Sequence, residues 1–169
     1  MKKNSASKKS LPKKTLSKKF LPKKSLPKIL IACDHAGFVL KKFLIAKFDK
    51  VDFEFVDLGC KSAEKSVDYP DYAKKLCAKI TVKNNLPGIL ICGSGIGVTI
   101  AANRFKHIRA ALCYNVKAAK LARAHNDANV LCLGARITKN NSALAIVKAF
   151  FSTEFEGARH AIRVAKLSQ

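Results

Sequence analysis

The sequence lacks a long hydrophobic run and lacks closely paired cysteines, and each absence excludes a class of protein. No apolar run reaches the ~18 residues that a membrane-spanning helix needs, and no signal-peptide stretch begins the chain. The six cysteines form no C-x-x-C pair, and several lie inside apolar runs, where thiols are typically buried and reduced. We therefore expect a cytoplasmic protein without a membrane span, rather than a disulfide-rich secreted one.

Acidic residues are scarce, and the excess of basic residues is unevenly spread. The chain has 11 Asp and Glu against 33 Lys and Arg, a net charge of +22 over 169 residues. Residues 1–28 hold 11 Lys and no acidic residue, in a pentad repeat such as Ser10-Leu11-Pro12-Lys13-Lys14. Prolines at this spacing fit neither a helix nor a strand, so residues 1–27 are predicted to be a disordered tail. Two interpretations stay open: a solvated tail without a partner, or a tether to nucleic acid or an anionic surface.

From residue 28 to residue 169, short apolar runs alternate with segments of helical period. The predicted strands are 29–32, 53–57, 88–92, 109–113 and 130–133. The predicted helices lie near 37–48, 69–82, 97–103, 115–124 and 142–150. Nearly continuous apolar strands are typical of a parallel sheet that is covered on both faces. This pattern predicts one α/β domain, a three-layer Rossmann-like fold with a five-stranded parallel sheet.

Polar and flexible residues follow three of these strands, where a parallel sheet binds its ligand. They are Cys33-Asp34-His35, the loop Gly93-Ser94-Gly95-Ile96-Gly97, and Gly134-Ala135-Arg136. This placement is typical of an enzyme. The loop has neither the G-x-G-x-x-G spacing nor the Gly-Lys-Ser/Thr ending of nucleotide-binding loops, so no nucleotide cofactor is expected. Its three glycines would let the backbone turn tightly and direct N–H groups at an anion.

Cysteine and histidine supply the candidate reactive groups. Cys92 ends a predicted strand and faces the glycine loop, where N–H groups favour a thiolate, whereas the other five cysteines are expected to fill the core. Among the four histidines, His35 follows a strand and His125 lies between a helix and a strand. We expect no metal site from the spacing of the histidines.

Seven runs, in order along the chain, resemble the group formed by ribose-5-phosphate isomerase B and the galactose-6-phosphate isomerases. They are residues 33–38, 56–59, 68–73, 88–97, 101–104, 125–130 and 157–160 with Arg163. The loop with its cysteine, together with His125-Asn126-Asp127, is more similar to ribose-5-phosphate isomerase B. The tail has no counterpart in the family, and Ala158 stands where the family often has glycine.

The resemblance implies a reaction through a cis-enediolate without metal or other cofactor, and it implies roles for site residues. Cys92 would move a proton between C1 and C2 of the sugar, and His125 would open the ring. The enediolate would be stabilised by the loop residues Gly93, Ser94, Gly95, Ile96 and Gly97. Sugar hydroxyls would be held by Asp34, His35 and Asn126. The phosphate would be bound by Arg136, Arg159 and Arg163.

The leading hypothesis is therefore an isomerase that interconverts D-ribose 5-phosphate and D-ribulose 5-phosphate in the non-oxidative branch of the pentose phosphate pathway. An isomerase of an aldohexose 6-phosphate, of the allose or galactose type, is the nearest alternative. A basic nucleic-acid-binding module on an inactive isomerase scaffold is a third.

The positions of Cys92 and His125 also bear on the oligomeric state. Cys92 ends a strand, whereas His125 follows a helix and precedes a strand, so the two lie at opposite edges of the predicted sheet. Both can serve one site only if a partner subunit supplies one of them. We therefore expect a homo-oligomer, at least a homodimer, with a site shared between subunits.

Overall fold

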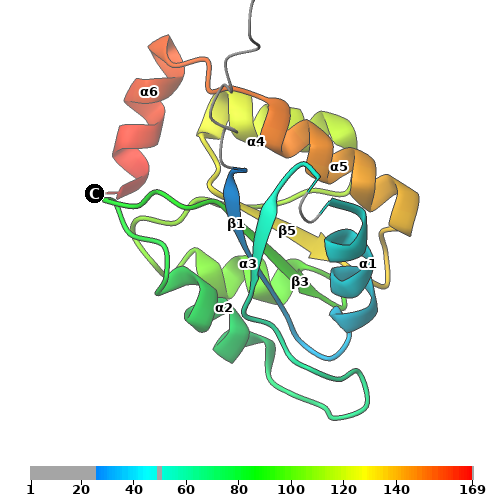
Figure 1. Ribbon diagram of the computed structural model, residues 1–169. Coiled ribbons are helices and arrows are strands. Elements are labelled where there is room, and N and C mark those ends of the chain that lie inside the picture. The colour runs from blue at the N-terminus through cyan, green and yellow to red at the C-terminus, as the bar shows by residue number, and fades with distance from the viewer. Residues whose placement is uncertain (1–25, 49–50, 169) are drawn as a thin grey trace, which may run out of the picture.

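The structure is a computed structural model that describes residues 26–48 and 51–168 (Figure 1). Within them, the strands are β1 (Lys28–Cys33), β2 (Glu54–Asp57), β3 (Gly88–Cys92), β4 (Ala110–Leu112) and β5 (Val130–Gly134). The helices are α1 (Phe38–Phe48), α2 (Tyr69–Cys77), α3 (Ile96–Ala102), α4 (Val116–Asn126), α5 (Asn140–Ser152) and α6 (Ala158–Ala165), followed by the 3-10 turn η1 (Lys166–Ser168). Strands and helices alternate up to α5, as the sequence predicts.

The five strands form one sheet in the order β2-β1-β3-β5-β4, and every neighbouring pair is parallel. The predicted fold class is thus confirmed. Because β3 lies in the middle of the sheet, its last residue, Cys92, lies between the ends of β1 and β5.

Helices cover both faces of the sheet because successive strand residues point to opposite sides. In β3, Ile89 and Ile91 pack into the cluster formed with α1, α4 and α5. Leu90 and Cys92 pack into the second cluster, formed with α2 and α3. All five residues of β3 are buried, which explains why the strand is a continuous apolar run.

Two helices differ from the prediction. Helix α2 ends at Cys77 rather than near residue 82. Beyond Cys77 the N–H groups of Lys79 and Ile80 donate to the Leu76 and Cys77 carbonyls, which replaces the helical pattern with a turn. The Asn84 side chain holds the segment after this turn, since its amide donates to the Lys79 carbonyl and its Oδ1 accepts from the Thr81 N–H. Helix α6 is not predicted at all. It contacts α4 outside the two helical layers, and among its residues His160 alone is buried, so its apolar residues are left largely exposed in this chain (Figure 1).

The described part of the chain contains no helix long and apolar enough to cross a membrane. The predicted disordered tail falls, up to residue 25, outside the described residues.

Candidate active site

A cleft of about 400 Å³ opens at the carboxyl ends of β1, β3 and β5. This is the edge at which parallel α/β sheets bind ligands. The cleft is lined by Asp34, Tyr69, Cys92, Gly93, Ser94, Gly97, Arg136 and Ile137. The structure thus brings Asp34, Cys92, the glycine loop and Arg136 together as predicted, whereas His35 does not line this cleft.

The thiol of Cys92 is held against the glycine loop. Its Sγ accepts a hydrogen bond from the Gly95 N–H at 3.1 Å, and the residue is 4% exposed. Gly95 has a φ of +82°, a left-handed conformation that a side chain would strain. The loop can therefore bend back onto the sulfur because glycine stands at this position.

Two N–H groups of the loop already have acceptors within the chain. Gly95 donates to Cys92, and the Ile96 N–H donates to the Ser94 Oγ at 3.2 Å. A bound oxyanion would therefore displace Cys92 Sγ and Ser94 Oγ as the acceptors of these two hydrogen bonds. The ring of Tyr69 packs on Gly97, where a Cβ would come within 2.6 Å of the ring carbon Cζ.

Three polar side chains follow β1 and β5 at this edge of the sheet, and two of them, Asp34 and Arg136, line the cleft together with the thiol. Asp34 is buried, and its Oδ1 accepts from the Gly37 N–H at 3.0 Å, which fixes the carboxylate at the end of β1. The Nδ1 of His35 accepts from the Val67 N–H at 3.1 Å, so the ring ties this strand end to the segment before α2. Arg136 is exposed and lies over Gly93, where a Cβ would be 3.3 Å from its Nε. Its guanidinium is therefore the positive group of this cleft.

The other predicted site residues lie elsewhere in the chain. His125 and Asn126 end α4 beside the amino ends of β4 and β5, because α4 runs back across the sheet after β4. Asn126 lines a separate cleft of about 390 Å³, together with Arg109 and Ala110 at the start of β4. Arg159 and Arg163 are exposed on α6, which contacts α4. The described chain by itself thus separates Cys92 and Arg136 from this second group of residues.

His125 and His160 form a stacked pair at this second edge. Their ring centroids are 4.2 Å apart and the planes differ by 4°. The Oε2 of Glu156 lies 3.8 Å from the Nε2 of His125 and 3.5 Å from that of His160. Burial lowers the pKa of His160, and the neighbouring charges of His125 and Arg159 lower it further.

This cluster bears on the expectation of no metal site, which was based on the spacing of the histidines. The expectation of no metal site overlooked Glu156, which stands four residues before His160. The three side chains bring ligand atoms within 4.8 Å of one another, and two histidines with a carboxylate are a donor set that zinc uses. However, the Nε of Arg159 lies 3.5 Å from the Nε2 of His160, and this positive charge opposes a bound cation.

The five other cysteines belong to the core, as predicted. All are buried, and burial raises the pKa of Cys77 to about 12, of Cys113 to about 11 and of Cys132 to about 12. Burial also raises the pKa of Cys33, whose Sγ lies 3.7 Å from that of Cys60. Thiols with raised pKa values are poor nucleophiles at neutral pH.

Comparison with known proteins gives the family. A family model described as Ribose/Galactose Isomerase matches residues 29–167. The chain belongs to this family. The predicted resemblance is thereby confirmed over residues 29–167.

Relatives agree with this assignment in sequence and in structure. A putative sugar phosphate isomerase of Rickettsia bellii is 48% identical over 139 residues, which are 82% of this chain and 96% of that protein. The structure of a ribose 5-phosphate isomerase from Thermotoga maritima matches with a TM-score of 0.80 and 47% identity, over 84% of this chain and 97% of that one. Ribose-5-phosphate isomerase B from Mycoplasma genitalium, solved with bound ribulose-5-phosphate, matches with a TM-score of 0.78 and 43% identity, over 83% and 93%.

Sequence reasoning gave no role to Tyr69, Ile137 or Glu156. Tyr69 stands in a motif that carries the family resemblance, but its place in the cleft depends on how α2 packs on α3. For Glu156 the spacing to His160 was an available signal.

Proposed function

We propose that the protein is a cofactor-free isomerase that interconverts D-ribose 5-phosphate and D-ribulose 5-phosphate. One observation carries the proposal: the Cys92 thiol lies at a glycine loop in a cleft with Asp34 and Arg136. The chain has this arrangement within a family whose Mycoplasma genitalium member was solved with bound ribulose-5-phosphate.

Cys92 acts as the base in this proposal. Its thiolate removes the proton from C2 of the open aldose, and the electron pair moves through C1 to the carbonyl oxygen, which gives the cis-enediolate and a neutral thiol. The thiol then returns the proton to C1 while the proton of the C2 hydroxyl passes to the C1 oxygen, which leaves the ketose and the thiolate. N–H groups of residues 93–97 stabilise the charge that develops on oxygen. Arg136 binds the phosphate from this edge, since a guanidinium fork matches its oxygens.

His125 opens the furanose ring, and it reaches the substrate from a partner subunit. This assignment is supported by the opposite positions of His125 and Cys92 in one chain. Asn126, Arg159 and Arg163 then approach the substrate from the partner together with His125, while Asp34 and His35 stay on the side of Cys92. The proposed enzyme is a homo-oligomer, at least a dimer.

Ribose 5-phosphate turnover tests the function, and Cys92→Ala tests the base. We expect the wild-type protein to form the ketose and Cys92→Ala to lower kcat about 100- to 10,000-fold, because proton transfer loses its base. Cys77→Ala is the matched control, since that thiol is buried in the core. It should leave kcat unchanged.

Three results would speak against the proposal. Full turnover by Cys92→Ala would refute the base assignment. Turnover of allose or galactose 6-phosphate but not of ribose 5-phosphate would favour the hexose alternative. Salt-sensitive nucleic-acid binding without any turnover would favour the inactive scaffold.

A further inference from the structure

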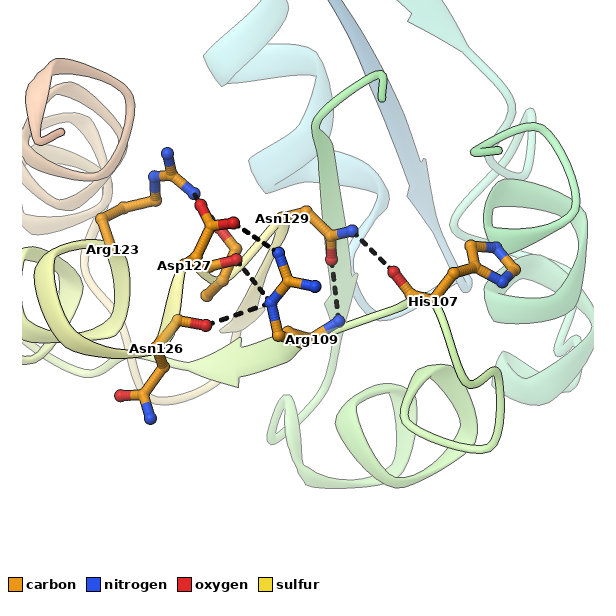
Figure 2. Close-up of polar contacts among 7 residues, drawn as sticks. His107, Arg109, Arg123, Asn126, Asp127 and Asn129 are labelled. Carbon is orange, nitrogen blue, oxygen red and sulfur yellow. Dashed lines mark hydrogen bonds and ion pairs between the residues drawn. The ribbon is translucent and has the colours of Figure 1, made fainter. Parts of the chain in front are cut away.

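Asp127 ends α4 in a conformation that few residues adopt. Its φ is +43° and its ψ is +44°, in the left-handed region that costs an L-residue energy, least for Gly, Asn and Asp. Two guanidinium groups hold its carboxylate there. Arg109 Nη2 donates to Oδ2 at 2.6 Å, and Arg123 Nη1 donates to Oδ1 at 2.8 Å (Figure 2).

The same two arginines hold the backbone of the turn. The Nε of Arg109 donates to the carbonyl oxygens of Asn126 at 3.1 Å and of Asp127 at 2.8 Å. Arg123 donates to the Ala128 carbonyl at 2.7 Å. Three consecutive carbonyl groups of the turn, residues 126–128, therefore each accept a hydrogen bond from an arginine. Figure 2 shows the two bonds that Arg109 donates to Asn126 and Asp127.

Arg109 is anchored in turn to the sheet. Its backbone N–H donates to the Oδ1 of Asn129 at 2.8 Å, and the Asn129 amide donates to the His107 carbonyl at 2.9 Å. Asn129 is buried and directly precedes β5 (Figure 2). Charge-assisted bonds on an anchored arginine give the turn a fixed place relative to β4 and β5.

We propose that Asp127, held by Arg109 and Arg123, is a positioning residue that sets the orientation of His125 and Asn126 toward the substrate. His125 and Asn126 are the two residues before Asp127, so the backbone of the turn sets where both side chains start. In Figure 2 the Asn126 side chain points away from the network and only its carbonyl takes part. The inference rests on the proposed function, in which His125 opens the sugar ring.

The chemistry of the two substrates separates this role from a structural one. Ribose 5-phosphate must open its furanose ring before C2 can lose a proton. Ribulose 5-phosphate cannot close a furanose ring, because its C5 oxygen carries the phosphate. Exchange of its C1 hydrogen with deuterium from solvent therefore reports the Cys92 step without the His125 step.

Asp127→Gly is the decisive variant, because glycine adopts a φ of +43° freely and loses only the carboxylate. We expect kcat for ribose 5-phosphate to fall about 10- to 100-fold, since a misplaced acid–base group costs this much. The KM for ribose 5-phosphate and the rate of C1 hydrogen exchange in ribulose 5-phosphate should each change less than about threefold, because the Cys92 side of the site is left intact. Asp127→Asn keeps an acceptor oxygen and tolerates this backbone, so it should recover part of the loss.

Asn103→Ala is the matched control. Asn103 bonds both the N–H and the carbonyl of Ala110 at the same edge of the sheet, but not the turn. It should lower the unfolding midpoint and leave kcat unchanged. The inference would be overturned if Asp127→Gly kept the wild-type kcat. It would also be overturned if Asp127→Gly lost isomerisation and hydrogen exchange to the same extent and Asn103→Ala showed the same losses. Failure of the wild-type protein to isomerise ribose 5-phosphate would instead refute the proposed function.

Discussion

Ala158 stands in a backbone conformation that suits glycine better. Its φ is +45°, directly after Gly157 with a φ of +66°, where the chain turns into α6. The alanine Cβ makes the left-handed region costly by roughly 1–2 kcal/mol. The chain keeps Arg159 on α6 despite this cost.

We expect Ala158→Gly to stabilise α6 locally by about 1 kcal/mol, because the strain of the left-handed alanine is removed. Amide hydrogen exchange of α6 measures this local stability. Ala161→Gly, an exposed site within the same helix, is the control and should speed exchange instead. Slower amide exchange of α6 in both variants, or in neither variant, would contradict strain at Ala158 as the cause.

Among the helices, α1 is tied to the end of β2 by a buried lysine. The Nζ of Lys41 lies 2.9 Å from the carboxylate of Asp57 and 2.7 Å from the Cys60 carbonyl. Asp57 Oδ1 also accepts from the Gly59 N–H at 2.9 Å. One carboxylate therefore pairs a buried ammonium group and shapes the turn after the strand.

Asp57→Ala should lower the free energy of unfolding by about 2 kcal/mol, because it leaves the Lys41 ammonium buried without its counter-charge. This loss is at the lower end of the range for a broken buried ion pair, because the Asp57 side chain is 41% exposed. Urea unfolding measures it. Glu54→Ala removes the exposed pair with Lys28 and should cost less than about 1 kcal/mol. Equal losses in the two variants would argue against burial as the cause.

Helices and strands that bury one or two full faces in the core of the chain could be predicted from the sequence. Elements without such burial could not. The apolar run 88–92 predicted β3 with both ends correct, because each of its residues is buried. Helix α6 buries only His160 in its own chain, so its apolar side chains do not pack into the core of that chain. The ends of α2 and α4 depend on the turn at Lys79 and Ile80 and on the left-handed Asp127, and the hydrophobic period of the sequence does not show such local backbone features.

On the scale of the whole molecule, the sheet separates the two proposed reactive groups. Strand order in the chain was enough to predict which residues share the edge of Cys92, since strand ends of a parallel sheet meet there. The stacked pair of His125 and His160 could not be predicted, because it depends on how α6 lies against α4. A site that uses both edges has to be completed by a second chain.

Mixing two inactive variants tests the shared site. Cys92→Ala and His125→Asn should each be inactive, but heterodimers formed by refolding them together contain one intact site and one doubly altered site. Random pairing gives half heterodimers, so about a quarter of wild-type activity should return. If each site lay within a single chain, the mixture would stay as inactive as its parents.

The distribution of the six thiols has a practical consequence for labelling. An alkylating reagent that reaches the folded chain meets one sulfur at the wall of a cleft and five inside the core. We therefore expect a covalent probe to react at Cys92 before Cys33, Cys77, Cys113 and Cys132, which are 1% exposed or less.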